Sequence, residues 1–243
     1  MQRRNFLRDS LLTSTGVLLV PALLKAESWL PSTAFNTPIN ARAKGEAFKH
    51  FWSKCAGAGR ACEGLRAGWL EQLKLAKEHC GFEYLRFHGL FHDDMFVYKE
   101  VNGNPVYNWQ YIDELFDRML EIGIKPFVEL GFMPKALASG ERTQFWWKGN
   151  VSAPSDYNKW ATLVGEFTKH CMSRYGLPEV KTWYFEVWNE PNLRAFWDAS
   201  KSEYFQLYKV SVNAIKAIDK NLRVGGPATS NFVPDERFDG DIE

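Results

Sequence analysis

A run of aromatic and β-branched residues at positions 183–192 most constrains how this chain folds. It reads WYFEVWNEPN, follows an amphipathic segment and a turn, and contains Pro191, which has no backbone donor. These residue types favour β-strands, and a proline is typical of a strand end. The run therefore predicts a buried strand that leads into a loop. In an extended strand, one face carries Tyr184, Glu186, Trp188 and Glu190.

Two carboxylates on one buried face require an explanation, because a buried charge is costly unless it is paired or hydrogen-bonded. Glu190 stands at the carboxyl end of the predicted strand, the edge at which α/β sheets and barrels build active sites. A catalytic role is one interpretation. The other is a carboxylate that caps the next segment or pairs with an arginine, and the residues alone leave both open.

Apolar spacing elsewhere predicts strands that alternate with helices. Strands are expected within residues 48–55 and over residues 83–89, 126–132 and 222–229. Helices are expected over residues 65–79, 156–175 and 202–218, and a further one contains residues 112–120 and ends at Gly123. This order predicts parallel βαβ units and hence an α/β fold.

Three connections between these elements have distinct sequences. Residues 56–59 (AGAG) predict a permissive loop after the first strand, and residues 96–109 predict a β-hairpin that turns at Asn102 and Gly103. Residues 133–155 form a long loop that contains three aromatic residues at 145–147. Loops of that length inside a compact domain are usually functional or disordered, and the aromatic residues argue against disorder.

The sequence WYFEVWNEPNL resembles the acid/base motif of glycoside hydrolase family 39, which includes β-xylosidases and α-L-iduronidases. Residues 51–60, 85–95 and 129–137 resemble the same family, so the likeness covers most of the chain after residue 40. The family belongs to a clan of retaining (β/α)8 TIM-barrel glycosidases. The resemblance implies that residues 43–243 are the N-terminal part of such a catalytic domain, with about its first five strands, because the last residues predict no sixth.

The resemblance also implies roles for individual residues. Glu190 matches the general acid/base, Asn189 the residue that hydrogen-bonds the sugar 2-hydroxyl, and His88 a sugar-binding histidine. We expect Phe132 and Trp146 to contact the carbohydrate as well, since aromatic rings offer large flat faces. For the rings at 145–147, packing beneath the loop is the alternative, and it stays open.

Retaining glycosidases need a second carboxylate about 5 to 5.5 Å from the acid/base. Glu186 lies four residues from Glu190, roughly 13 Å along an extended strand, which is too far. Glu129, on the neighbouring predicted strand, is not excluded by distance. The resemblance instead places the nucleophile at the end of barrel strand seven, beyond residue 243. We therefore expect a truncated chain that is inactive by itself.

The expected function is a retaining glycoside hydrolase of β-linked sugars, foremost a β-xylosidase of xylo-oligosaccharides or related hemicellulose. An inactive carbohydrate-binding remnant and an iduronidase-like or other glycosidase specificity are the alternatives. The family needs no metal or cofactor, and we expect neither. The acidic and histidine residues at 88–94 lack the spacing of a known ligand set, and the cysteines lack paired zinc spacing.

The amino terminus predicts export. Arg3 and Arg4, followed by Phe-Leu, form a twin-arginine pattern before an apolar run at residues 11–24. That run is shorter than the roughly 20 helical residues that span a bilayer. Residues 1–26 are therefore expected to be a cleaved signal peptide and residues 27–42 a linker or lead-in. The mature protein is then periplasmic or secreted, without stable membrane insertion.

The charge distribution indicates no nucleic-acid partner. The chain has a net charge of +1, and residues 1–26 hold four basic residues and one acidic residue, a net +3. The remainder is therefore +1 − 3, or −2, which gives no basic footprint. Cys55 and Cys62 are close enough in sequence to pair. However, twin-arginine substrates fold in a reducing cytoplasm before export, which predicts free, buried thiols.

Overall fold

A computed structural model describes residues 44–231 of the chain. The predicted signal peptide, the predicted linker at residues 27–42 and residues 232–243 lie outside the described residues. The chain divides into two units, Met1–Phe48 and Lys49–Glu243. All helices and strands of the described residues belong to the second unit.

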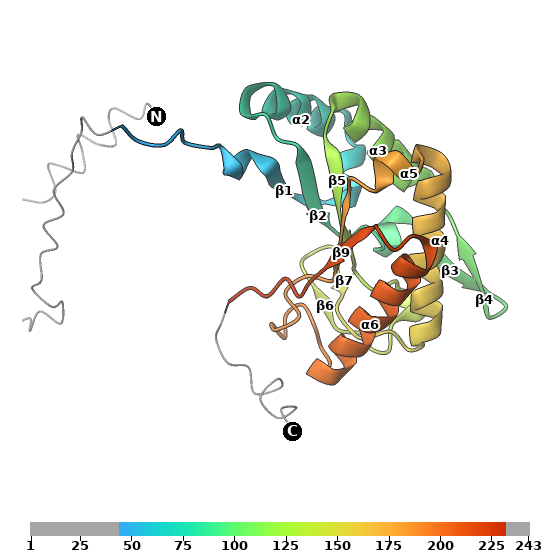
Figure 1. The fold of residues 1–243 in the computed structure, drawn as a ribbon. Coiled ribbons are helices and arrows are strands. Elements are labelled where there is room, and N and C mark those ends of the chain that lie inside the picture. Colours follow the sequence, from blue (N-terminus) through green and yellow to red (C-terminus); the bar gives the residue numbers. More distant parts are fainter. Residues whose placement is uncertain (1–43, 232–243) are drawn as a thin grey trace, which may run out of the picture. The chain divides into compact units, whose positions relative to one another are not determined.

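A five-stranded parallel sheet forms the centre of the second unit (Figure 1). Its strands lie in the order β1 (Cys55–Arg60), β2 (Tyr84–His88), β5 (Lys125–Leu130), β8 (Tyr184–Val187) and β9 (Arg223–Gly225). Every neighbouring pair is parallel, so the carboxyl ends of all five strands lie at one edge. The predicted alternation of strands and helices is confirmed.

Helices connect the strands. They are α2 (Ala67–Cys80), α3 (Gln110–Ile122), α4 (Tyr157–Tyr175), α5 (Leu177–Val180) and α6 (Lys201–Ile218). In Figure 1, α3, α4, α5 and α6 lie on one side of the sheet. The single turn of α5 was not predicted, although Pro178 in its first turn suits a helix start.

Shorter elements fill the connections. The predicted hairpin is confirmed as β3 (Tyr98–Val101) and β4 (Asn104–Tyr107), and a smaller one pairs β6 (Thr143–Gln144) with β7 (Gly149–Asn150). Asn102 and Gly103 have φ values of 52° and 77°, as a tight turn with two left-handed residues requires. Single 3-10 turns are η1 (Phe51–Lys54), η2 (Ala61–Leu65), η3 (Asp93–Met95) and η4 (Lys135–Leu137).

Local sequence explains where the long helices begin and end. Ser200 caps α6 through the backbone N–H of Glu203, and the Glu203 side chain accepts from the backbone N–H of Ser200, which is a capping box. Asp156 caps α4 by accepting from two backbone N–H groups. Gly123 ends α3 with a φ of 83°, a left-handed conformation that glycine adopts without a Cβ clash.

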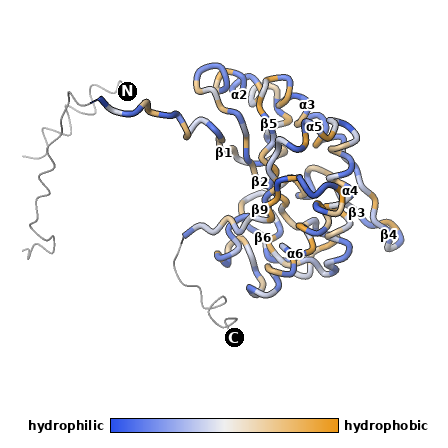
Figure 2. Tube along the Cα trace, viewed as in Figure 1, coloured by the Kyte–Doolittle hydropathy of each residue, from blue (hydrophilic) through white to orange (hydrophobic). Residues whose placement is uncertain are grey.

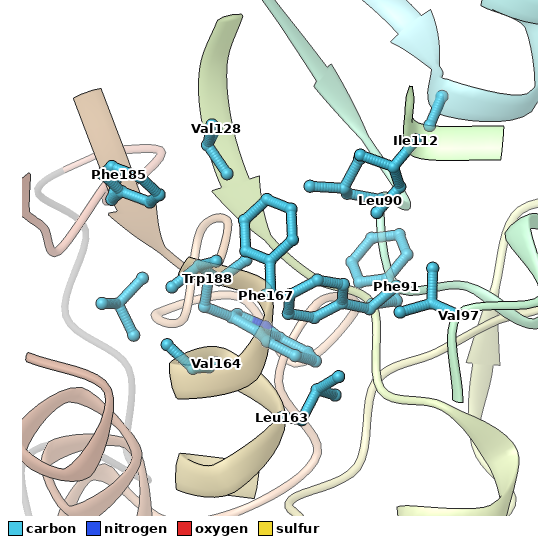
Figure 3. Packing of buried hydrophobic residues seen from close by; sticks show 14 of the residues in the cluster. Leu90, Phe91, Val97, Ile112, Val128, Leu163, Val164, Phe167, Phe185 and Trp188 are labelled. Atoms are coloured by element: carbon cyan, nitrogen blue, oxygen red, sulfur yellow. The ribbon is translucent and has the colours of Figure 1, made fainter. Parts of the chain in front are cut away.

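The core lies between the sheet and the helix layer (Figure 3). Val128 of β5 and Phe185 of β8 point toward α4, whose Phe167 lies 6.5 Å from the Phe185 ring. Burial of each such side chain stabilises the fold by about 1.5–3 kcal/mol. Figure 2 shows hydrophobic and hydrophilic residues alternating along the helices, as expected for elements with one buried face.

The first strand differs from the prediction. Residues 51–54 form a 3-10 turn with exposed aromatic rings, and the strand is Cys55–Arg60, so the residues expected to form a loop, 56–59, are in the sheet. A Cβ added at Gly57 would meet nothing within 4 Å, and one at Gly59 would meet only the carboxylate end of the Glu63 side chain. The AGAG sequence is therefore part of a strand and not a flexible loop.

The strand that contains the motif is shorter than predicted. β8 ends at Val187, and Trp188 and Glu190 have φ values of 68° and 44°, so the two-residue alternation stops. Trp188 is fully buried in the core instead of sharing a face with Glu186. The fifth strand also shrinks, from the predicted residues 222–229 to Arg223–Gly225.

The four cysteines are free thiols, but only Cys171 is fully buried, and burial raises the pKa of its thiol. Cys55 is exposed, so the expectation of buried thiols is wrong there. Among residues 44–231, no helix has the length and apolar character that crossing a bilayer requires.

Candidate active site

Side chains on the sheet face away from the helices form layers. Tyr84, Phe127 and Tyr184 make an aromatic layer, with ring centroids 5.1 Å apart for the tyrosine pair and 5.4 Å for Phe127 and Tyr184. Two residues further along the same strands come Arg86, Glu129 and Glu186. Because side chains on one face repeat every second residue, the strand register places these three charges side by side.

Arg86 connects this charged layer to the motif loop. Its Nε donates to Glu186 Oε2 at 2.5 Å, and its Nη2 lies 3.0 Å from Glu129 Oε2. The same Nη2 donates to Asn189 Oδ1 at 2.7 Å. Burial raises the pKa of Glu186, although the guanidinium opposes this shift. Desolvation lowers the pKa of Arg86, but the two carboxylates outweigh it and hold that pKa above its ordinary value.

Asn189 is 4% exposed and follows β8 directly. An arginine can only donate hydrogen bonds, so the Asn189 atom that faces Arg86 is the oxygen. The other end of the amide, Nδ2, is buried and has no partner among the described residues. The structure therefore leaves an oriented donor at the carboxyl end of β8.

His88 stands one layer above Arg86 on β2. Its Nδ1 lies 2.7 Å from Glu129 Oε2, and the Glu129 side chain is fully buried. Three rings surround the imidazole, at centroid distances of 5.8 Å for Phe132, 5.8 Å for Phe145 and 6.0 Å for Phe196. The histidine that the sequence singled out is thus held by one carboxylate and an aromatic wall.

The backbone after β8 positions Glu190. Trp188 turns into the core, where its indole N–H donates to the Phe196 carbonyl at 2.7 Å. The next left-handed residue, Glu190, donates its backbone N–H to the Ala228 carbonyl at 2.9 Å, and Asn192 Oδ1 accepts from the backbone N–H of Ser230 at 3.0 Å. Glu190 is partly exposed, so its carboxyl group remains accessible at the edge of the sheet.

Two predicted sugar contacts occupy different environments. Phe132 is fully buried beneath His88 and Phe145, so it has no surface to offer to a sugar, contrary to expectation. Trp146 is 77% exposed, and the Arg60 guanidinium lies 5.0 Å from its ring centroid. Since Arg60 ends β1 and pairs with His88 in the strand register, Trp146 borders the carboxyl edge on the β1 side.

Arg60 itself is nearly buried and pairs with Asp94 of η3. It also lies 5.1 Å from the Trp147 ring centroid. Arg60, at the end of β1, therefore contacts both Asp94, which follows β2, and the loop at residues 145–147. Trp147 packs on Phe145 at 5.1 Å. Of the three loop aromatics, Trp147 therefore packs beneath the loop, whereas Phe145 and Trp146 keep exposed surface.

Neither internal glutamate is suited to attack a sugar. Glu129 and Glu186 are both buried and paired with Arg86. The earlier distance estimate for Glu186 rested on an extended strand through Glu190, and that premise is wrong because β8 ends at Val187. One Glu129 oxygen, Oε1, is buried without a partner among the described residues.

Sequence reasoning missed Arg86 as a site residue, and it considered Phe145 for the sugar site only together with Trp146 and Trp147. Arg86 lies two positions before His88 in a predicted strand, so alternation alone could have placed both on one face. Phe145 was only one of three loop aromatics, and nothing in the sequence distinguishes it. Residues 44–231 contain no group of histidine, cysteine and acidic side chains arranged to hold a metal.

Comparison with known proteins shows the family of the chain. The family model of glycosyl hydrolases family 39 matches residues 36–237. A β-xylosidase of Geobacillus stearothermophilus is 52% identical over 198 residues, which cover 79% of this chain and 39% of that protein. The Homo sapiens α-L-iduronidase is 30% identical over 173 residues, covering 68% of this chain and 25% of that protein.

A solved structure shares the fold. The monomeric β-xylosidase from Caulobacter crescentus CB15 superposes with a TM-score of 0.71 at 47% identity, over 73% of this chain and 36% of that one. The chain thus spans less than half the length of each of these relatives. Its five parallel strands belong to a (β/α)8 barrel of which they are one part. The sequence motif, the parallel sheet and the extent of the family match lead to one conclusion: the chain belongs to glycosyl hydrolase family 39.

Proposed function

We propose that this chain carries the acid/base half of a retaining β-xylosidase site, with Glu190 as general acid/base. The observation that carries the proposal is the buried, unpartnered Nδ2 of Asn189 next to Glu190. An orphaned buried donor costs about 1–3 kcal/mol, and a substrate hydroxyl would satisfy it. Asn189 would therefore donate to the 2-hydroxyl of the sugar while Glu190 protonates the leaving oxygen.

In this mechanism Glu190 first acts as an acid and then as a base. It gives its proton to the glycosidic oxygen while a second carboxylate attacks the sugar, and it later removes a proton from the water that hydrolyses the glycosyl-enzyme. Glu129 and Glu186 are occupied by Arg86. We therefore place the nucleophile on barrel strand seven, beyond residue 243, with His88, Phe145 and Trp146 as further sugar contacts.

The charges favour a neutral sugar over a uronic acid. Arg60 is paired with Asp94, and Arg86 with two glutamates, so neither of these two arginines is available for a substrate carboxylate. Glu190 adds a further acidic group. The names of the Geobacillus and Caulobacter relatives, both β-xylosidases, support the same choice.

The acid role of Glu190 is testable with two leaving groups. The test uses a fusion enzyme, in which this chain is joined to the part of the Geobacillus relative that follows the matched segment. In it, Glu190→Gln should slow an alkyl β-xyloside by about 10²–10⁴-fold. An aryl β-xyloside with an acidic phenol needs little protonation and should be slowed far less in the glycosylation step. Equal losses on both substrates would remove Glu190 from the acid role.

A binding module without turnover is the second candidate, because the described residues supply candidate sugar-contacting groups, while the proposed nucleophile lies outside them. The 243-residue chain should release no product from aryl β-xyloside while still binding xylose in calorimetry. Loss of that binding in Asn189→Ala would support the site. Turnover that Glu190→Ala abolishes would instead show that this chain contains its own nucleophile, and Glu129 would be the first to test.

We also propose that the chain is exported by the twin-arginine route. The support is sequence alone, because Arg3, Arg4 and the following apolar run precede the described residues. Changing both arginines to lysine should leave the protein in the cytoplasmic fraction. Undiminished appearance in the periplasm would contradict this.

A further inference from the structure

Glu129 has no part in the proposed mechanism, yet it is a fully buried charged group next to the site. Burying a carboxylate costs several kcal/mol unless strong partners compensate. Its partners are Arg86 and His88, and both meet the same oxygen, Oε2, at 3.0 Å and 2.7 Å. The geometry of that shared oxygen determines what His88 can do.

A carboxylate oxygen can only accept hydrogen bonds, and the guanidinium N–H of Arg86 already approaches Oε2 as a donor. The contact from His88 Nδ1 at 2.7 Å is favourable only if that nitrogen carries a hydrogen. In a neutral imidazole the second nitrogen, Nε2, then has a lone pair and no hydrogen. The rings of Phe132 and Phe145 stack against the imidazole and fix its plane.

We propose that Glu129 is a positioning residue that locks His88 in the Nδ1–H tautomer, so that Nε2 accepts a hydrogen bond from a sugar hydroxyl. The part that concerns the sugar rests on the proposed function. The tautomer does not. His88 is partly exposed, so Nε2 is open to a ligand at the carboxyl edge.

Two neighbouring residues would then recognise the sugar with opposite polarity. Asn189 presents only a donor, because Arg86 occupies its oxygen, and His88 presents only an acceptor, because Glu129 occupies its N–H. With the 2-hydroxyl assigned to Asn189, His88 would accept from the hydroxyl at carbon 3 or carbon 4. Replacing that hydroxyl by fluorine, which cannot donate, should weaken binding by roughly 10- to 100-fold.

Nitrogen-15 NMR of the 243-residue chain tests the tautomer without any substrate. The chain has five histidines, so ring labelling gives five imidazole patterns, and His88→Gln identifies the relevant one. At about pH 8, where free imidazole is neutral, His88 should carry its hydrogen on Nδ1. A hydrogen on Nε2, or on both nitrogens, would overturn the proposal from the unmodified chain alone.

Two variants of Glu129 separate the effect of its hydrogen-bond acceptor from the effect of its negative charge. Glu129→Gln keeps an oxygen for Arg86 and His88 and should retain the Nδ1–H pattern, whereas Glu129→Met removes the acceptor and should shift the hydrogen to Nε2. Glu186→Met is the matched control, because Glu186 pairs with Glu129 in the strand register and also binds Arg86 but makes no hydrogen bond to His88. A change of tautomer in Glu186→Met, or none in Glu129→Met, would contradict a specific role for Glu129.

Titration of methyl β-xyloside and its 3-fluoro and 4-fluoro analogues into the same labelled chain tests the acceptor. One analogue should bind roughly 10- to 100-fold more weakly than the parent, and this penalty should shrink in Glu129→Met, whose His88 can donate. Equal penalties in both proteins would refute the acceptor role. Absence of binding by the parent xyloside would contradict the proposed function, while the spectrum still decides the tautomer.

Discussion

Arg86 Nη2 and Asn189 Oδ1 lie 2.7 Å apart, and this hydrogen bond decides which end of the asparagine amide a ligand can reach. Because Nδ2 alone remains, Asn189→Ala in the fusion enzyme should lower kcat/KM for a β-xyloside by about 100-fold or more. Hydrogen bonds to the 2-hydroxyl contribute several kcal/mol in the transition state. On a 2-deoxy substrate the same variant should lose almost nothing. An equal loss on that substrate would show that Asn189 acts by another route.

Arg86 should matter for stability as well as for the site. Arg86→Met leaves Glu129 and Glu186 buried without a cation, and breaking a buried ion pair costs about 3–5 kcal/mol. Urea unfolding of the 243-residue chain measures this loss. Arg118→Met is the control, since Arg118 pairs with two glutamates on the exposed face of α3, and its loss should lower the free energy of unfolding by less than about 1 kcal/mol.

The charged layer also predicts a pH dependence. Burial raises the pKa of Glu186 above its ordinary value of 4.5, despite Arg86. The folded chain therefore binds this proton at a higher pH than the unfolded chain. This group then lowers stability as the pH rises from 4.5 through the raised pKa, and contributes more stability below that range.

In Glu186→Gln the amide at position 186 does not titrate, so this variant is the reference for the pH dependence that Glu186 contributes. The free energy of unfolding of the unmodified chain, relative to Glu186→Gln, should increase as the pH falls through that window. The matched control is Glu114→Gln on α3, whose side chain is 55% exposed. A difference between chain and Glu186→Gln that stays constant with pH would show that burial does not perturb Glu186.

Gly149 of β7 allows the aromatic loop to close. A Cβ at this position would overlap Phe132 and come within 2.6 Å of Trp147 Cζ3. Gly149→Ala should therefore destabilise the chain by about 1–3 kcal/mol, as overpacking does. Gly165→Ala on α4 is the control, because nothing lies within 4 Å of its added Cβ. Equal stability of the two variants would mean that the loop yields without cost.

Periodicity predicted the parallel units because the apolar residues of a helix recur at the spacing of its buried face. In α4 these residues are Leu163, Val164 and Phe167. Capping and turn residues placed the boundaries of α4, α6 and the hairpin well. The same rules failed at β1. Glycine is depleted in strands, so residues 56–59 indicated a loop, whereas the pairing of β1 with β2 is a tertiary contact that a single sequence does not specify.

The residues of the candidate site could be proposed from the sequence, but their geometry only in part. The motif singled out Glu190 and Asn189, whose roles stay proposals, whereas the network through Arg86 depends on the register of three strands, which a single sequence does not specify. Phe132 illustrates the same limit. Its ring type suits a sugar platform, but the loop at residues 145–150 folds over it, and that closure is a tertiary contact.

The hydrogen bond between Glu190 and Ala228 couples the loop after β8 to the segment after β9, so the two must change together. The backbone bond from Glu190 to Ala228, and the one from Ser230 to Asn192, tie the loop after β8 to the segment after β9. A residue inserted into or deleted from residues 226–230 would displace Glu190, the proposed acid, although Glu190 itself had not changed. Recombination or loop grafting among relatives should therefore preserve function only when both loops are exchanged together.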